Sequence, residues 1–316
     1  MERSAEHGEV PESPRVDADS GETQPVIPAG LPQSMDDLGI VPPPRRKYPV
    51  TMGGSLRELA RARELLVTFV ERDLRVRYKQ TVLGGLWAIL QPFILMVIFS
   101  IVFGKIAKVG SEGAPYPIFS YSALVPWGFF SGALTYGTTV LIQNAGILRK
   151  IYLPREVFPL ASVLSSSVDF AASWVILLPM LLVYGSFPRL TWLAYPLLIL
   201  VLALFAVAGA LFVSAAAVHY RDIRYVVPTM LQVVLYLTPV AYPLSKAEAT
   251  LPAGLRHLYP YLNPLVPIVD GFRRVLIHGL WPAWGPLAVS TAVGIVLVAL
   301  SYRWYKRIDP TFPDVI

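Results

Sequence analysis

A run of basic residues stands directly before a long apolar stretch near residue 80. In RDLRVRYKQTVLGGLWAILQP (72–92) the first eight residues carry five charges, four of them basic, and no charge follows between Thr81 and Phe103. From Ser55 to Lys79 apolar residues recur at spacings of three and four, with charged residues on another face, which predicts an amphipathic helix. Cations on such a helix are attracted to lipid head groups. The run is therefore interpreted as a head-group-binding element, or as a membrane anchor only.

Motifs for catalysis and for metal binding are missing from the sequence. The chain has no cysteine, which excludes disulfides, thiolate catalysis and Cys-ligated metals. It has no G-x-x-x-x-G-K-[ST] phosphate loop and no H-E-x-x-H cluster, and its four histidines, at 7, 219, 257 and 278, are far apart. The acidic pair in DAD (17–19) is typical of some glycosyltransferases, but it lies in a segment whose composition favours disorder. The sequence therefore predicts no catalytic residue, no metal site and no cofactor in this chain.

One carboxylate, Asp169, falls about midway along a predicted membrane span. An ionisable group at that depth is costly and normally faces protein or water. It is interpreted either as a proton relay or as a structural group that is hydrogen-bonded to Ser165 or Ser173, one turn away on each side. The structural interpretation is favoured, because a single carboxylate without a paired His or Lys makes a poor relay.

The composition shows which elements must position these residues. The chain has 316 residues, of which 54% are hydrophobic and 15% charged, and its mean hydropathy is +0.54. Soluble domains are nearer a quarter charged. A helix needs about 20 apolar residues to cross a bilayer, and six segments reach that length: about 82–103, 117–142, 157–184, 191–217, 225–244 and 283–302. The predicted fold class is an all-α polytopic membrane protein with six transmembrane helices.

The basic residues cluster at the ends of the apolar segments, which indicates membrane topology and not a nucleic-acid-binding face. Clusters lie before the first span, at 149–156, at 219–225 and at 303–307. All four fall on one side if six helices alternate, and the excess of positive charge predicts that this side is the cytoplasm, with both termini inside. The outer segment 246–281 weakens the prediction, because it carries Lys246, Arg256, Arg273 and Arg274.

Two segments outside the spans have unusual compositions. Residues 1–50 hold nine acidic residues, five basic residues and nine prolines, which predicts a disordered acidic, Pro-rich tail. The segment LYPYLNPLVPIVDGFRRVLIHGLWP (258–282) is too broken by proline and glycine to cross the membrane. A pair of short re-entrant helices is expected there, because irregular backbone at membrane depth needs protein or water against it.

The loop NAGILRKIYLPREVFPL (144–160) is short and basic, and it carries apolar residues that are expected to be exposed. These residues are Ile151, Tyr152 and Leu153, just before Pro154. A chain without a nucleotide site can be driven by a partner that has one. The loop is interpreted as the docking element for such a partner, with an ordinary basic turn as the alternative.

Five sequence blocks, taken together and in order, resemble one family. They are RDLRVRYKQTVLGGLWAILQP (72–92), PYPIFSYSALVPWGFF (115–130), LRKIYLPREVFPL (148–160), HYRDIRYVVP (219–228) and YLNPLVPIVDGFRRVL (261–276). These blocks are similar to the signature blocks of the ABC-2-type permeases that export lipid-linked polysaccharides such as O-antigen, teichoic acid and capsule. The resemblance covers about residues 65–310.

The resemblance implies a homodimer of six-helix permeases in the bacterial cytoplasmic membrane. It implies two copies of a separate ATP-binding-cassette ATPase, which binds ATP and Mg, so that this chain is itself no enzyme. The implied segments are an interfacial gate helix at 55–80, a transmembrane domain at 82–304, a coupling helix at about 145–156, outer re-entrant helices at about 248–280 and a cytoplasmic C-terminus at 305–316.

The resemblance also implies roles for single residues. The joint between the gate helix and the first span corresponds to Leu83, Gly84 and Gly85. The pyrophosphate of a polyprenyl-linked glycan needs cations at head-group level, where Arg75, Arg77, Tyr78 and Lys79 lie. Coupling to the ATPase is assigned to Arg149, Lys150, Ile151, Tyr152, Leu153 and Arg155.

A moving sugar chain needs aromatic faces and hydroxyl groups along its path. The candidates are Trp87, Trp127, Phe129, Phe130, Tyr236 and Tyr242, each of which is alternatively a packing or interfacial residue. In the family the first and fifth spans line the path, which favours Trp87, Tyr236 and Tyr242.

Other functions stay open from the sequence. An ABC-2 exporter of drugs or simple lipids would share all these elements. A membrane glycosyltransferase with a polyprenyl donor would need paired carboxylates in one site, and on the predicted outer face there are only the scattered Glu112, Glu248 and Asp270. A proton-coupled carrier would need more than Asp169.

Overall fold

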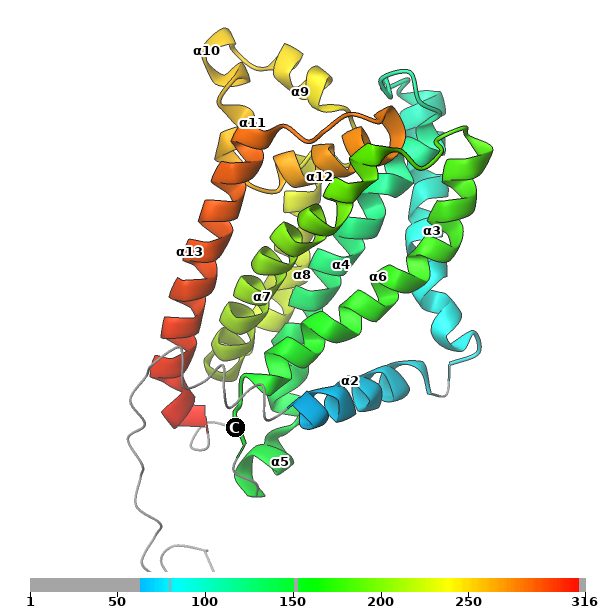
Figure 1. Cartoon of the computed structure of the whole chain (residues 1–316). Coiled ribbons are helices and arrows are strands. Elements are labelled where there is room, and N and C mark those ends of the chain that lie inside the picture. The colour runs from blue at the N-terminus through cyan, green and yellow to red at the C-terminus, as the bar shows by residue number, and fades with distance from the viewer. Residues whose placement is uncertain (1–62, 80, 151–152, 313–316) are drawn as a thin grey trace, which may run out of the picture. The chain divides into compact units, whose positions relative to one another are not determined.

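The computed structural model describes residues 63–79, 81–150 and 153–312 (Figure 1). These residues belong to one compact unit, and within them the chain forms helices and no strands. The all-α prediction is therefore confirmed for the described part. The tail predicted at 1–50, and the part of the amphipathic helix before Arg63, lie outside the described residues.

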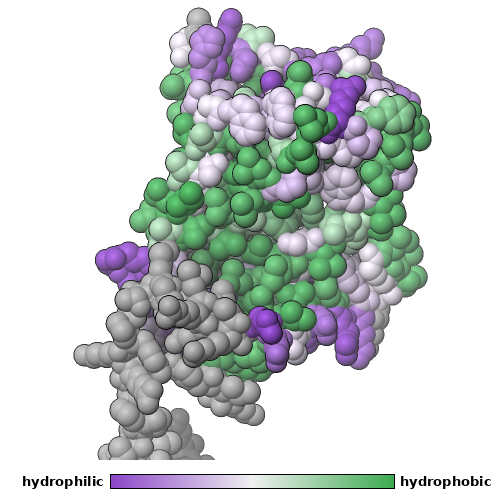
Figure 2. Space-filling view, viewed as in Figure 1, coloured by the Kyte–Doolittle hydropathy of each residue, from purple (hydrophilic) through white to green (hydrophobic). Residues whose placement is uncertain are grey.

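Long helices form a bundle in the described part of the chain. They are α3 (Trp87–Phe99), which a π-helical turn (η3, Ser100–Ile106) extends, α4 (Tyr116–Gln143), α6 (Val157–Val183), α7 (Tyr195–His219), α8 (Ile223–Leu237) and α13 (Trp284–Ile308). The amphipathic helix α2 (Arg63–Tyr78) lies across one end of the bundle, beside the foot of α4 and α6 (Figure 1). Figure 2 shows hydrophobic residues over the middle of the visible face and hydrophilic residues toward its two ends.

Four helical segments of the described chain are long and apolar enough to cross a membrane: Gly84–Ile106, Val157–Val183, Leu190–His219 and Trp284–Thr311. They correspond to four of the six predicted spans. The segment predicted at 225–244 forms α8, which has 15 residues and at 1.5 Å per residue reaches about 22 Å, less than the roughly 30 Å of a hydrocarbon core. Six spans therefore remain a prediction.

The segment predicted at 117–142 forms α4, which is long but less apolar than the other four. Its position explains this composition, because α4 packs against α3, α6, α7, α8 and α12 and most of its residues are buried. A helix that faces protein on most sides can carry serines, tyrosines and glycines that lipid would penalise. Small residues at its contacts, such as Gly137 against Ala210, let the backbones approach closely.

The segments predicted to be cytoplasmic meet at one end of the bundle. A small core there joins α2, α5 (Ala145–Lys150), the start of α6 and the end of α13. Within it the Phe69 and Phe158 rings have centroids 4.8 Å apart, and a ring nitrogen of His219 lies 3.1 Å from the Thr311 hydroxyl. The prediction that these four segments share one side agrees with this arrangement.

The opposite end is built from short helices (Figure 1). Where the sequence predicts a pair, the described chain has α9 (Leu244–Thr250), α10 (Ala253–Arg256), α11 (Tyr259–Leu262), α12 (Val266–Arg273) and a π-helical turn (η5, Arg274–His278). Proline stands at or next to the first residue of α9, α10, α11 and α12, where its fixed φ starts a helix without losing a hydrogen bond. The repeated prolines therefore explain why the segment is divided further than expected.

Arg273 differs from the expectation for a loop cation. Its side chain is fully buried in α12, with its guanidinium 3.7 Å above the Phe119 ring. It donates hydrogen bonds to the carbonyls of Val240 at 2.5 Å and Phe119 at 3.2 Å, and to that of Pro239. Counting Arg273 as a topology-setting surface charge was wrong, because the carbonyls that follow α8 bind it inside the protein. The outer segment is less positive at its surface than its sequence indicates.

Candidate substrate-binding site at the interfacial helix

The joint after α2 depends on a glycine. α2 ends at Tyr78, and a 3-10 turn (η2, Gly84–Leu86) leads into α3 with a sharp change of direction (Figure 1). Gly84 has φ +52, in the left-handed region that only glycine adopts at little cost, whereas Gly85 has no positive φ. No atom of the described residues lies within 4 Å of a Cβ built at either glycine. The structure thus distinguishes Gly84, which forms the turn, from Gly85, which has space but no special backbone.

The four residues predicted at head-group level divide into two pairs. Arg77 and Tyr78 are half-buried and face the bundle, while Arg75 and Lys79 are exposed. The helical period separates them, since residues two apart point to different faces of α2. Of these four residues, Arg77 and Tyr78 contact helices of the bundle.

Arg77 and Tyr78 both bind Asp169 of α6. Arg77 Nη1 lies 2.5 Å from Asp169 Oδ2, and the Tyr78 hydroxyl donates to Asp169 Oδ1 at 2.7 Å. The Arg77 guanidinium also lies 3.4 Å from the centroid of the Tyr136 ring of α4. Burial, and then the hydrogen bond with Asp169, raise the pKa of Tyr78, so its hydroxyl stays a donor at neutral pH. This network fastens the end of α2 to two helices of the bundle.

The expected partners of Asp169 were wrong. The Ser173 hydroxyl donates to the backbone carbonyl of Asp169 at 2.9 Å and not to its carboxylate, and Ser165 Oγ has no partner among the described residues. The carboxylate instead reaches past its own helix to α2. A charge at this position is satisfied by an arginine and a phenol, as an ionisable group in a membrane protein requires.

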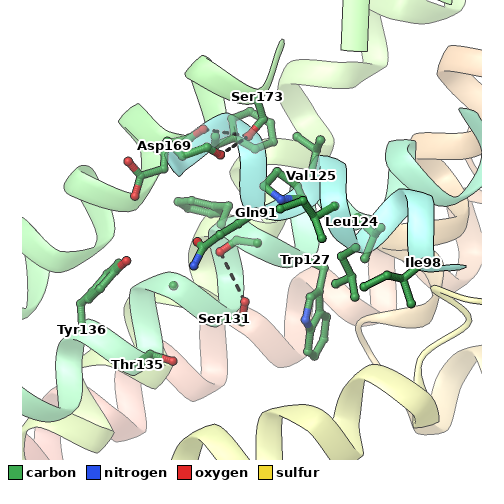
Figure 3. A pocket seen from close by; sticks show the side chains of 18 of the residues that line it. Gln91, Ile98, Leu124, Val125, Trp127, Ser131, Thr135, Tyr136, Asp169 and Ser173 are labelled. Carbon is green, nitrogen blue, oxygen red and sulfur yellow. Dashed lines mark hydrogen bonds between the residues drawn. The ribbon is translucent and has the colours of Figure 1, made fainter. Parts of the chain in front are cut away.

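A cavity of about 570 Å³ opens beside this network, between α2, α3, α4 and α6. Figure 3 shows Gln91, Tyr136 and Asp169, from α3, α4 and α6, around one open space. Its polar lining groups are those of Tyr78, Gln91, Ser131, Thr135, Tyr136, Asp169 and Ser173, and its remaining lining residues are apolar or small. We call it the long cavity. Polar groups that converge in a mostly apolar hollow are typical of ligand sites.

The predicted path residues are not gathered in one place. Trp127 and Phe129 line the long cavity, whereas Phe130, which is buried, does not. Trp87 and Tyr236 are exposed, at 39% and 55%, and the Tyr242 hydroxyl donates to the Tyr236 carbonyl at 2.7 Å. Neither these three nor Phe130 line the long cavity. The role of all six in transport stays a prediction.

The predicted coupling segment forms the short helix α5 and a turn. The side chains of Arg149 and Lys150, and the whole of Ile151 and Tyr152, lie outside the described residues. Leu153 was expected to be exposed but is buried, at 8%, in the small core next to α2. Arg155 pairs with Asp309 at 2.9 Å. Leu153 and Arg155 therefore both hold the loop in place.

Sequence reasoning missed several residues of the site. Tyr136, Thr135, Ser131 and Gln91 lie on α3 and α4, where each looks like an ordinary residue of a membrane helix. The signal that could have led to them is Asp169, because an intramembrane carboxylate needs a cation to pair with, and the basic run before the first span is one source of such a cation. No group of three or more metal-ligating side chains occurs within the described residues.

Comparison with known proteins identifies the family. A family model described as ABC-2 type transporter matches residues 64–277, which is more than half of the chain. The chain belongs to the ABC-2 type transporter family. The matched region runs from α2 into the π-helical turn after α12. Both the network around Arg77 and the buried Arg273 therefore lie within the ABC-2 region.

Individual relatives extend this likeness over most of the chain. The ABC-2 chain is 28% identical over 243 residues to the O-antigen export system permease protein RfbA of Myxococcus xanthus, covering 77% of this chain and 92% of that protein. It is 26% identical over 254 residues to the protein of the same name from Klebsiella pneumoniae, covering 80% and 95%. It is 24% identical over 213 residues to the Polysialic acid transport protein KpsM of Escherichia coli, covering 66% and 79%.

Proposed function

We propose that this chain is the permease subunit of an ATP-binding-cassette exporter that moves a lipid-linked polysaccharide across the cytoplasmic membrane. The observation that carries the proposal is the likeness, over more than nine tenths of their own length, to relatives named as O-antigen export permeases. The chemistry of the site supports such a substrate, because Arg77 of α2 is paired with Asp169 beside a mostly apolar cavity that also carries polar groups.

Membership of an ABC-2 family implies an ATPase partner, and we propose two copies of it on a homodimer of this chain. ATP and Mg would bind to the partner. The docking element would be the segment 145–156, with Arg149, Lys150, Ile151 and Tyr152 toward the ATPase. In support, α5 lies at the same end of the bundle as α2 and the end of α13 (Figure 1).

The proposed arrangement in the membrane has six spans, with α4 and α8 added to the four apolar segments. The end that holds α2 and α5 would face the cytoplasm, together with both chain termini. The basic residues at 149–155 and 303–307 support this orientation.

Co-purification with an ABC ATPase subunit, followed by measurement of ATP hydrolysis with and without lipid-linked glycan, tests the function. We expect a stable complex whose hydrolysis rate rises when the glycan is added. A chain that retains no ABC ATPase subunit would contradict the proposal.

A second candidate is the export of a drug or a simple lipid, which the mostly apolar lining of the long cavity favours. The same assay separates the two functions. Stimulation by glycan-free lipid as strong as by lipid-linked glycan would support the second candidate against the first.

A further inference from the structure

A second cavity, of about 470 Å³, lies between α2 and the last two turns of α4. Besides Tyr136, its polar lining residues are Arg72, Asp73 and Arg77 of α2, Thr139, Gln143 and Asn144 at the end of α4, and Ser162 of α6. We call it the basic cavity. Tyr136 lines both this cavity and the long cavity, and the Arg77 guanidinium covers the Tyr136 ring at 3.4 Å. The Arg77–Tyr136 pair therefore stands between the two hollows.

The cations of the basic cavity have donors to spare. An arginine carries five N–H donors, and Arg77 uses them for Asp169, at 2.5 Å, and for the adjacent Tyr78 hydroxyl. Arg72 makes one, to the neighbouring Asp73 at 2.8 Å. The Gln143 side chain makes no hydrogen bond to a described residue and is exposed. Planar guanidinium groups with free N–H bonds bind the oxygens of phosphate particularly well.

The position and lining of the two cavities fit the two parts of an amphiphile. On α4 the long cavity extends from Leu124 to Tyr136, which is about 18 Å along the helix at 1.5 Å per residue. The basic cavity lies at the α2 end of that stretch, where an amphipathic helix places its cations among lipid phosphates. A phosphate would face the two arginines, and an apolar chain would lie against residues such as Ile94 and Ile98.

We propose that the basic cavity binds the phosphate of a lipid through Arg72 and Arg77, while the lipid chain lies in the long cavity. Asp73 and Asp169 hold the two arginines in the absence of the lipid and are displaced by its phosphate. The proposal rests on the proposed function only for the lipid's source, a polyprenyl-linked substrate. The proposed site includes Arg72 in place of Arg75 and Lys79, which are exposed and line neither cavity.

Binding of polyprenyl diphosphate to the purified full chain in phosphatidylcholine nanodiscs tests the site. Arg72→Gln and Arg77→Gln should each weaken binding about tenfold, the loss expected from one charge-assisted hydrogen bond. Arg63→Gln, at an exposed position at the start of the same helix, is the matched control and should bind within about twofold of the unchanged protein. Equal affinity of all three variants would overturn the proposal.

Replacement of the two competing carboxylates should raise the affinity for polyprenyl diphosphate, whereas replacement of the arginines lowers it. Asp73→Asn and Asp169→Asn should tighten binding, because the phosphate no longer displaces an anion from its arginine. If Arg77→Gln fails to fold, the double variant Arg77→Gln/Asp169→Asn leaves no unpaired charge, and it should fold and still bind about tenfold more weakly. Weaker binding by both Asn variants would contradict the displacement of the carboxylates.

Three further measurements separate the sources of the phosphate. Gly128 lines the long cavity and has open space at its Cβ position among the described residues. Gly128→Leu should therefore weaken the binding of polyprenyl diphosphate but leave the binding of inorganic pyrophosphate unchanged. Equal loss of both would contradict a lipid chain in the long cavity. Phosphatidylglycerol that competes as well as the polyprenyl lipid would identify an ordinary membrane lipid as the source.

Lipid binding and glycan export test the proposed site and the proposed function separately. Lipid binding that depends on Arg72 and Arg77 in a complex that exports no glycan would support the site and contradict the function. Export of glycan that is unaffected when both arginines are replaced would support the function and contradict the site.

Discussion

At the scale of single residues, Gly84 should be far more sensitive to substitution than Gly85. Gly84→Ala forces a side chain into the left-handed region at φ +52, which costs about 1–2 kcal/mol, while the new Cβ of Gly85→Ala meets no atom of a described residue within 4 Å. We expect the first variant to insert but to export poorly, because the cost falls on the turn that aims α2. Export of glycan to the cell surface, normalised to the amount of chain in the membrane, measures the difference. Equal export by the two variants would show that the left-handed turn is dispensable.

Asp270 should make stability depend on pH. Its carboxyl is buried in α12, and burial raises its pKa to about 6, against the opposing effect of Arg274 and Arg273. Because the folded state favours the protonated form, the contribution of this group is largest below about pH 4 and is lost as pH rises through about 6. The shift from 3.8 corresponds to about 3 kcal/mol. Thermal unfolding of the purified chain between pH 4 and pH 8 should show this loss, and Asp270→Asn should remove it.

The pairing of Arg77 with Asp169 shows where sequence reasoning stopped. Each residue was recognised as costly or functional by itself, Arg77 from the basic run and Asp169 from its depth in a span. Their contact joins positions 92 residues apart, and periodicity reports only on neighbours along one helix. A similar limit hid the burial of Arg273, because nothing local in GFRRVL distinguishes an arginine bound by carbonyls from one in solvent.

At the scale of elements, a charged cluster joins the proposed docking segment to the end of α13. Lys306 Nζ lies 2.5 Å from Glu156 Oε1 and 3.7 Å from Asp309 Oδ2, and Arg155 lies 2.9 Å from Asp309 Oδ1. The Glu156 side chain is only 6% exposed. The loop after α5 thus depends on the last helix for its position, although the sequence separates them by more than half the described chain.

Replacement of Lys306 should lower the stability of the folded chain. Lys306→Met leaves the Glu156 carboxylate buried without its cation, which should lower the free energy of unfolding by about 3 kcal/mol and weaken retention of an ATPase subunit. The exposed neighbour Arg307 is the control, and Arg307→Gln should change stability by less than about 0.5 kcal/mol. Thermal unfolding and co-purification measure the two effects. The double variant Glu156→Gln/Lys306→Met should regain most of the stability; no recovery would contradict an electrostatic cause.

Hydropathy predicted where the long helices lie more reliably than it predicted whether their apolar residues face lipid or protein. Long apolar runs require helices in lipid whatever their tertiary contacts, and so 157–184 and 191–217 were predicted within a few residues of their observed limits. At 225–244 the apolar run continues past Leu237, where α8 ends, into the carbonyls that bind Arg273. Residues 238–241 are buried inside the protein, whereas much of α8 is exposed, and composition alone does not distinguish apolar residues that face protein from those that face lipid.

At the scale of the whole molecule, orientation in the membrane can be tested without background labelling, because the chain contains no cysteine. Gly146 in α5 and Gly254 in α10 lie at opposite ends of the bundle, and both have open space at the Cβ position. We expect a membrane-impermeant thiol reagent on intact cells to label Gly254→Cys and not Gly146→Cys. Labelling after cell disruption confirms that Gly146→Cys reacts. The reverse pattern would invert the proposed topology.

The place of Arg77 has a consequence for the timing of transport. The same guanidinium holds α2 to Asp169 and covers the ring that divides the two cavities. If the proposed lipid phosphate draws this guanidinium away, the Arg77–Asp169 pair breaks and the Tyr136 ring between the two cavities is uncovered in the same movement. On this proposal, binding of the lipid and loosening of the contact between the end of α2 and α6 would be one event, and a lipid that does not bind Arg77 would leave that contact intact.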